Sequence, residues 1–219
     1  EDFEAYPRDR ERDAAMLARA GCDLLFAPPV GEMYPPGYAT EVRVRGLTDC
    51  LCGAARPGHF DGVAQVVAKL LNQAGADAAV FGEKDWQQLA VIRRLARDLD
   101  IPTEILGAPT VREADGLAMS SRNRYLRPEE RRIAGQLNAV LREAAGAIAA
   151  GKPAPAACET ARAALLAAGF ERLDYVECRT AGDLAPVERH DPAVPARVFA
   201  AARIGRARLI DNMPVEAAP

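Results

Sequence analysis

The sequence predicts an α/β protein in which a domain built on a parallel sheet precedes a smaller α+β domain. Two observations favour this class. Between residues 78 and 106, two short apolar segments flank an amphipathic helix, and this strand–helix–strand order is typical of a parallel sheet. After Pro109, two alanine-rich helical segments are followed by three strand-like segments, which indicates a separate α+β domain. We therefore expect domains at residues 1–110 and 111–219.

The chain before the parallel unit contains one predicted helix and two candidate strands. Glu11–Ala20 has the pattern of a helix that ends at a glycine. Cys22–Ala27 is a short apolar run bounded by two prolines, which predicts a buried strand. Glu41–Arg45 alternates polar and apolar residues and is a possible strand.

The parallel unit follows a helix predicted over Asp61–Ala74, whose valines and leucines share one face. Ala78–Phe81 then predicts a buried strand, Asp85–Leu99 a helix and Thr103–Leu106 a second strand. Ligands of parallel sheets bind beyond the carboxyl ends of the strands. The turn Gly82–Asp85 is therefore expected at a binding position.

The second domain begins with two helices rich in good helix formers. Pro128–Ala150 predicts a long helix, and Ala154–Ala168 predicts another after a Gly-Lys-Pro break. Three further segments are typical of strands: Leu173–Cys178, Ala196–Ala201 and Ala207–Ile210.

Composition gives no indication of a nucleic-acid or membrane partner. The 219 residues carry a net charge of -3, and no run approaches the ~20 apolar residues of a membrane span. The five cysteines are odd in number and form no CxxC pair, so we expect free thiols in a reducing cytoplasm. A role for Cys50 and Cys52 does not follow from their positions.

The turn Gly82–Asp85 has the residues of a phosphate site. A glycine at a strand end admits a ligand close to the backbone, and the N-terminus of the following helix attracts anions. Lys84 adds a positive charge, and Asp85 is a favoured N-cap residue. The alternative interpretation is a capped turn with a solvated lysine.

Met119–Asn123 is a second candidate, because two hydroxyls and a guanidinium follow one another there. The forked donors of Arg122 match phosphate oxygens, and we expect a loop that closes on a phosphate. The alternative is a polar loop between domains. His59 precedes a helix and is suited to proton transfer or phosphate binding, although a lone histidine in a turn is more often structural.

Several common catalytic motifs are absent from the sequence. It contains no GxGxxG, no GxSxG and no HExxH, and a glycine pair with P-loop spacing is followed by His59 instead of Lys-Ser/Thr. Since the two histidines are far apart, a catalytic triad or a histidine-based metal site is not indicated.

Five ordered blocks resemble the pantothenate synthetases. The resemblance runs from Tyr6 to Asn212. The blocks are Ala5–Arg8, Arg56–Phe60, Phe81–Leu89, Val111–Asn123 and Arg208–Asn212. It implies a Rossmann-like nucleotidyltransferase domain, a small C-terminal lid domain and a homodimer. It also implies that ATP, with Mg²⁺, activates pantoate as pantoyl adenylate, and that β-alanine then displaces AMP to give pantothenate.

The resemblance assigns roles by position. The catalytic residues would be Lys84, Ser120, Ser121 and Arg122, and Gln88 would bind pantoate. The ATP-binding residues would be Gly82, Glu83, Lys84, Asp85, Val111, Met119, Ser120, Ser121 and Arg122. Val111 would contact the adenine side through its backbone, and the last four residues would form the closing loop.

The chain also departs from the family pattern. The family's first strand, its HxGH block with the catalytic histidines and its later Asn-Pro-x-Gln-Phe block do not occur here. We therefore expect a Rossmann-like sheet that is incomplete at its N-terminus, with exposed strand edges and apolar faces. Metal ligands are not assigned. Two alternatives stay open: another nucleotidyltransferase of the same superfamily, or a truncated or degenerate nucleotide-binding dimer without turnover.

Overall fold

The computed structural model describes residues 9–216, and its contacts divide the chain into two compact units, Glu1–Thr40 and Glu41–Pro219. The first unit contains α1 (Arg10–Arg19) and α2 (Val30–Met33). The predicted first helix is confirmed as α1. It begins where it does because the Asp9 carboxylate accepts a hydrogen bond from the backbone N–H of Arg12, as an N-cap residue should.

The predicted strand Cys22–Ala27 is wrong. This segment has irregular backbone, and its apolar side chains are exposed, with Leu24 at 80% and Phe26 at 55%. A strand needs a hydrogen-bonding neighbour, and both sheets in the described residues are built from other segments. An apolar pattern alone does not provide that neighbour.

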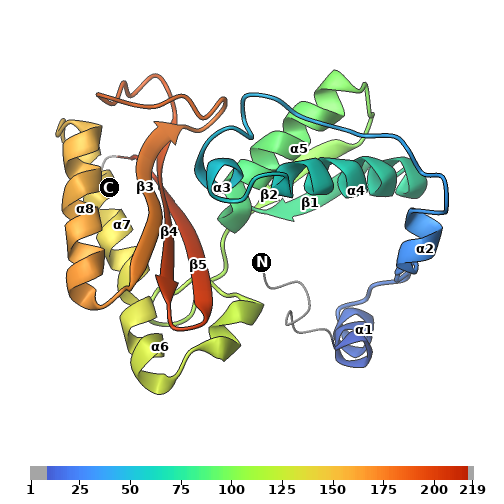
Figure 1. Cartoon of the computed structure of the whole chain (residues 1–219), viewed down its shortest axis with the longest axis horizontal. Helices are drawn as coiled ribbons and strands as arrows, with labels where there is room; N and C mark the ends of the chain where they lie inside the picture. Colours follow the sequence, from blue (N-terminus) through green and yellow to red (C-terminus); the bar gives the residue numbers. More distant parts are fainter. Residues whose placement is uncertain (1–8, 217–219) are drawn as a thin grey trace. The chain divides into compact units, whose positions relative to one another are not determined.

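The parallel unit lies within Glu41–Pro219 and is confirmed. Its elements are α3 (Leu51–Ala55), α4 (His59–Ala74), β1 (Ala78–Gly82), η1 (Glu83–Asp85), α5 (Trp86–Asp98) and β2 (Glu104–Ala108). Strands β1 and β2 pair in parallel, from Ala78 opposite Glu104 to Gly82 opposite Ala108. Figure 1 shows α4 and α5 beside this small sheet.

Burial alternates along β1, so the strand prediction is confirmed but its full burial is wrong. Ala79 and Phe81 pack against the core formed with α4 and α5, together with Ile105 of β2. Val80 and Leu106 point the other way and are 64% and 39% exposed. An exposed apolar face on the parallel sheet is therefore confirmed.

The predicted strand Glu41–Arg45 is also wrong. The backbone there is irregular, and side chains satisfy part of it. The N–H of Val42 donates to Gln65 Oε1 (3.0 Å), and the carbonyl of Val44 accepts from Thr48 Oγ1 (2.6 Å). Because these side-chain partners take the place of the hydrogen bonds of a strand ladder, the alternating pattern here buries Val44 and partly buries Val42 without forming a strand.

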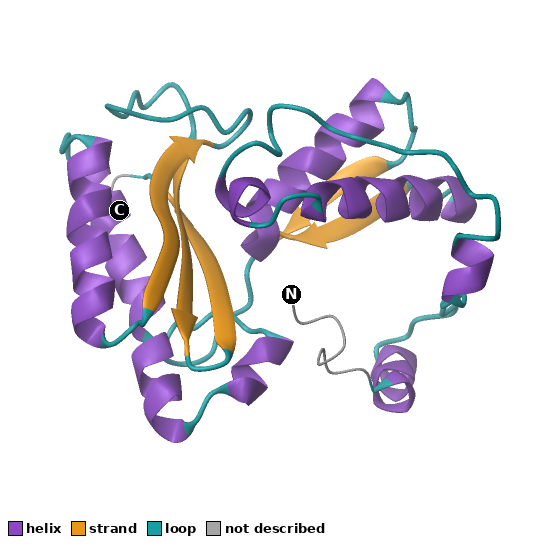
Figure 2. Ribbon diagram, in the orientation of Figure 1, coloured by secondary structure: helices purple, strands orange, loops and turns teal. Residues whose placement is uncertain are grey.

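The antiparallel sheet has the order β3-β4-β5 and is backed by two helices (Figure 2). Its elements, with the segments that lead to it, are η2 (Ser121–Tyr125), α6 (Pro128–Ala134), α7 (Gln136–Ala149), α8 (Ala154–Ala168), β3 (Arg172–Thr180), β4 (Ala196–Ile204) and β5 (Ala207–Pro214). The predicted helix Ala154–Ala168 and all three predicted strands are confirmed. The boundary near residue 110 stays a prediction.

The central strand β4 is buried on both faces. Val198 and Ala200 belong to the core shared with α7 and α8, whereas Phe199 and Ala201 belong to the core shared with α4 and α5. Successive side chains of a strand point to opposite faces, so this one strand contributes to both cores. The antiparallel sheet thus lies between the helical pair and the parallel unit.

The predicted continuous helix Pro128–Ala150 is wrong, because it is interrupted at Gly135 between α6 and α7. A Cβ on Gly135 would lie 2.6 Å from Asp115 Oδ2, so only glycine admits this approach. Among the described helices, none is long and apolar enough to cross a membrane.

Asp174 and Arg208 form a buried ion pair that should stabilise the sheet. Arg208 Nε lies 2.7 Å from Asp174 Oδ2, and both side chains are at least nine-tenths buried. Replacing Asp174 by asparagine leaves the guanidinium without its counter-ion. We expect the free energy of unfolding to fall by about 2 kcal/mol at pH 7, measured by urea denaturation.

The pH dependence of that difference tests the ion pair directly. Burial alone would raise the pKa of Asp174, but the hydrogen bond from Arg208 and the charges of Arg208, Arg203 and Arg172 outweigh burial and hold this pKa below its usual value. A carboxyl with a depressed folded-state pKa stabilises the protein above its unfolded pKa of about 3.9, and the stabilisation is lost as the pH falls through the folded-state pKa. The difference between the two proteins should therefore narrow below about pH 4. A difference independent of pH would contradict this origin.

Candidate functional site

The turn Gly82–Asp85 lies at the carboxyl end of β1, where a parallel sheet presents its ligands. Gly82 has extended backbone, and among residues 9–216 no atom beyond its two chain neighbours lies within 4 Å of the position that a Cβ would take. This open space lets a ligand approach the backbone. Lys84 is half-buried in the short 3-10 turn η1 that leads into α5.

Asp85 occupies the N-cap position of α5, but its side chain makes no capping hydrogen bond. The expectation that it caps the helix is therefore wrong for this structure. Its φ and ψ of -94° and 52° differ from the extended backbone typical of an N-cap. The first N–H groups of α5 are not bonded by this side chain.

A small hairpin brings together two residues that the sequence assigned to the nucleotide. The N–H of Met119 donates to the carbonyl of Val111 (2.9 Å), and the N–H of Glu113 donates to the carbonyl of Leu117 (2.9 Å). Val111 and Met119 are 65% and 47% exposed. The residue assigned to the adenine side and the first residue of the closing loop therefore lie next to each other.

The closing loop continues as the 3-10 helix η2. Ser120 is its N-cap, because its Oγ accepts from the backbone N–H of Arg122 (3.3 Å). The side chain of Asn123 donates to the carbonyl of Ala118 (3.2 Å), which holds the loop against the hairpin. Ser120, Ser121 and Arg122 are all partly exposed.

Strand β5 contacts both candidate segments, since η1 and η2 each pack against it. The buried Asn212 donates from Nδ2 to the carbonyls of Glu83 (2.9 Å) and Lys84 (3.0 Å). Its neighbour Asp211 forms two hydrogen bonds with Arg112 at the base of the hairpin (2.7 and 2.9 Å). Two segments about 30 residues apart in sequence are thus held by adjacent residues of one strand.

Trp86, directly after the turn, joins the same contacts. Its indole N–H donates to the carbonyl of Ala181 (2.9 Å), and the guanidinium of Arg197 lies 3.9 Å from its ring centroid. Arg197 Nε also donates to Asn212 Oδ1. Burial lowers the pKa of Arg197, an effect that the nearby carboxylates of Glu83 and Asp211 oppose.

Gln87 and Gln88 are neighbours with different environments. Gln87 is buried, and its Oε1 accepts from the N–H of Cys52 (2.9 Å) while its Nε2 donates to the carbonyls of Leu47 and Cys50 (both 2.8 Å). Gln88 is half-buried. Successive residues of a helix point about 100° apart, so only one of the two can fill the buried network. Gln88 keeps the exposure that a ligand-binding side chain needs.

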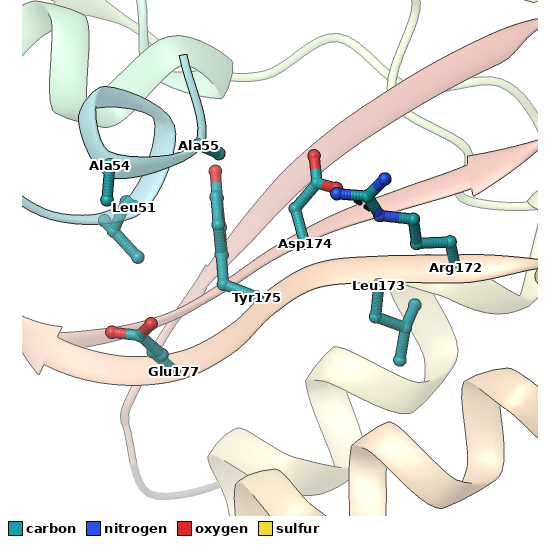
Figure 3. Close-up of a pocket in the computed structure, with 8 residues that line it drawn as sticks. All are labelled: Leu51, Ala54, Ala55, Arg172, Leu173, Asp174, Tyr175 and Glu177. Atoms are coloured by element: carbon teal, nitrogen blue, oxygen red, sulfur yellow. Dashed lines mark ion pairs between the residues drawn. The ribbon is translucent and has the colours of Figure 1, made fainter. Parts of the chain in front are cut away.

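A pocket of about 280 Å³ lies between α3 and β3, away from these segments. Figure 3 shows Tyr175 and Asp174 of β3 facing Ala54 and Ala55 of α3 across it. None of the sequence-predicted site residues lines this pocket. It is therefore not the substrate site that the sequence indicates.

Beside the pocket, Cys52 is buried in a polar contact. Its thiol lies 3.0 Å from the Tyr175 hydroxyl and 3.5 Å from the guanidinium of Arg208. Burial and the adjacent Cys52 raise the pKa of Tyr175 well above its ordinary value. The Cys52 thiol contributes to packing between the parallel unit and the antiparallel sheet.

The sequence did not single out Asp211, Asn212, Arg112, Trp86 or Arg197 for a role. Four of the five lie within the blocks that carry the family resemblance, so their place in these blocks is the sequence signal that could have identified them. Within residues 9–216, no three or more side chains of His, Cys, Asp or Glu are grouped so that they could hold a metal ion.

The fold is that of the Rossmann-like nucleotidyltransferases, a class of enzymes, with an additional C-terminal domain. A family model for pantoate-beta-alanine ligase matches residues 1–214. The chain belongs to this family.

Relatives and solved structures agree with the assignment. The chain is 58% identical over 215 residues to the pantothenate synthetase of Dinoroseobacter shibae, covering 98% of the chain and 76% of that protein. It is 60% identical over 216 residues to that of Paramagnetospirillum magneticum, covering 99% and 75%. The crystal structure of pantothenate synthetase from Thermus thermophilus superposes with a TM-score of 0.91 at 49% identity, covering 98% of this chain and 78% of that one.

A third structure carries ligands. The pantoate-beta-alanine ligase of Francisella tularensis, in complex with beta-gamma ATP and beta-alanine, matches with a TM-score of 0.79 at 30% identity. The match covers 99% of this chain and 74% of that protein.

Proposed function

We propose that this chain catalyses the ATP-dependent condensation of (R)-pantoate with β-alanine to pantothenate, releasing AMP and pyrophosphate. One observation carries the proposal. The Lys84 turn and the hairpin that leads into Ser120–Arg122, which match the family's nucleotide-binding blocks, are anchored on adjacent residues of β5. The related enzyme of Francisella tularensis is complexed with beta-gamma ATP and beta-alanine.

In the first step, a carboxylate oxygen of pantoate attacks the α-phosphorus of ATP. A new oxygen–phosphorus bond forms, the bond to the bridging oxygen breaks, and pyrophosphate leaves with its electrons. Negative charge builds up on the α-phosphate and on the leaving group. Lys84 and Arg122 supply positive charge where it builds up, and the backbone N–H groups at the start of α5 add donors.

Ser120 and Ser121 offer hydroxyl donors to the same phosphates. Gly82, Glu83 and Asp85 form the turn around them, while Val111 and Met119 border the adenine side. Gln88 orients pantoate for in-line attack, which is a gain of positioning and not of covalent chemistry. In the second step, the β-alanine amine attacks the acyl carbon, AMP leaves, and the amine loses a proton.

Mg²⁺ belongs to this proposal as a companion of the triphosphate. Magnesium is usually held by one or two carboxylates together with substrate phosphates. The described residues offer no cage of three protein ligands, in accord with a metal that arrives with ATP. We also assign to the protein a homodimeric state, a cytoplasmic location and a lid formed by residues 111–219.

Release of AMP tests the proposed function and separates it from its two alternatives. AMP formation that requires ATP, pantoate and β-alanine together would support the ligase. Use of CTP without dependence on β-alanine would support another nucleotidyltransferase. Nucleotide binding without any AMP would support a non-catalytic nucleotide-binding protein.

Arg122→Ala should lower kcat/KM for ATP by about 30-fold, because a charged hydrogen-bond donor to phosphate contributes about 2 kcal/mol. Steady-state kinetics with saturating pantoate and β-alanine measure this effect. Arg124→Ala is the matched control, since Arg124 is an exposed arginine of the same 3-10 helix. Equal effects of the two substitutions would contradict the role of Arg122.

A further inference from the structure

The block Arg208–Asn212 carries part of the family resemblance but has no role in the chemistry described above. Its last two residues lie in β5, an edge strand of the antiparallel sheet. Both are almost fully buried, Asp211 at 3% and Asn212 at 2% exposed. A buried polar side chain is stable only when its hydrogen bonds are satisfied, so its partners indicate what it holds in place.

The partners of Asn212 fix the orientation of its amide. The amide nitrogen donates to two successive carbonyls, those of Glu83 and Lys84, and the amide oxygen accepts from Arg197. The reversed orientation would place an oxygen against two carbonyls and a nitrogen against a guanidinium. The side chain therefore has a single satisfied arrangement, which defines the position of the backbone at Lys84.

Asp211 holds the hairpin in place through its own hydrogen bonds. Its two carboxylate oxygens each accept from Arg112, and Oδ1 also accepts from the N–H of Asn212 (2.8 Å). Arg112 in turn donates to the carbonyl of Gly116 across the hairpin (3.0 Å). The hairpin ends at Met119, and the closing loop with Ser120 and Arg122 follows it directly.

We propose that Asp211 and Asn212 are positioning residues that set the separation between the Lys84 turn and the closing loop, and so align the two sources of positive charge on ATP. The inference rests on the proposed function for its link to ATP. The mechanical part, that these residues hold the turn and the hairpin, is testable without any turnover.

Hydrogen–deuterium exchange tests the mechanical part. Asn212→Ala removes both donors to the turn, and exchange in the peptide spanning residues 82–89 should rise at least several-fold. Asn212→Asp, of the same shape but without the amide donors, should do the same. Thr103→Val is the control, because it removes one buried hydrogen bond to the carbonyl of Ala76 (2.9 Å) at the opposite end of β1. In that protein, exchange at 82–89 should stay as in the wild type.

Trp86 provides a spectroscopic readout at the same place, since it is the one tryptophan of the sequence. Its ring contacts Arg197, which Asn212 holds. The emission maximum of Trp86 should shift in both Asn212 variants and stay unchanged in Thr103→Val. A melting temperature recorded for each variant separates this local change from global unfolding.

Kinetics test the link to ATP. Misplacement of catalytic groups by about 1 Å costs on the order of 10- to 100-fold in rate. Both Asn212 variants and Asp211→Asn should therefore lose that much in kcat, with a smaller change in KM for ATP, whereas Thr103→Val should keep its kcat. If exchange at 82–89 and Trp86 emission do not change in the Asn212 variants, the positioning role is overturned. If they do change but the wild type forms no AMP, the proposed function fails while the positioning of the turn stands.

Discussion

Lys84→Ala should lower the rate of pantoyl adenylate formation by about 100- to 1000-fold, the loss found when one preorganised donor to a developing negative charge is removed. Lys84 lies in the turn at the end of β1, on a backbone whose position Asn212 fixes. The point from which its side chain extends is therefore held in place when the α-phosphate reacts. The exchange of labelled pyrophosphate into ATP, with pantoate and without β-alanine, measures this step alone.

The control for this prediction is Lys152→Ala. Lys152 is an exposed lysine between α7 and α8 whose Nζ contacts Thr160 (3.0 Å), remote from the Lys84 turn in sequence and in the fold. It accounts for the general effect of removing one positive charge. Near-normal exchange in Lys84→Ala would refute the assigned role.

Gln87→Leu should destabilise the fold by about 3 kcal/mol, because two buried backbone groups lose their amide partner at once and each costs about 1–3 kcal/mol. These groups are the N–H of Cys52 and the carbonyl of Leu47, whereas the carbonyl of Cys50 keeps the N–H of Gly53 (2.8 Å) as a donor. Leucine fills a similar volume but offers neither a donor nor an acceptor. Urea denaturation at neutral pH measures the loss.

The neighbouring substitution Gln88→Ala separates stability from binding. Gln88 is half-buried, so its replacement should leave the urea midpoint nearly unchanged and raise KM for pantoate. If Gln88→Ala unfolds the protein as readily as Gln87→Leu, or if Gln87→Leu is as stable as the wild type, the division of roles between the two residues is wrong.

The sequence predicted those elements whose pattern is complete within the element. The amphipathic faces of α4 and α5 are read within a single segment. Cys22–Ala27 and Glu41–Arg45 were wrong because their conformation depends on partners elsewhere in the chain. The break at Gly135 also depends on a distant group, the carboxylate of Asp115.

The candidate site divides in the same way. Residue types and order predicted the Lys84 turn and the Ser120–Arg122 loop as phosphate-binding segments, because phosphate binding has a recognisable local chemistry. Nothing local distinguishes Gln87 from Gln88, and nothing local links Asn212 to Lys84, since the two are 128 residues apart. Which side chains support the site depends on tertiary contacts.

The 128-residue separation between Lys84 and Asn212 also has a consequence during protein synthesis. A ribosome adds about 5–20 residues per second, so the Lys84 turn leaves it on the order of ten seconds before the strand that anchors it. During that interval the parallel unit can form its own core, but the carbonyls of Glu83 and Lys84 have no bond from Asn212. The proposed nucleotide site therefore reaches its final geometry only after β5 has been made and has joined the sheet, so ATP binding should begin only after β5 has been synthesised.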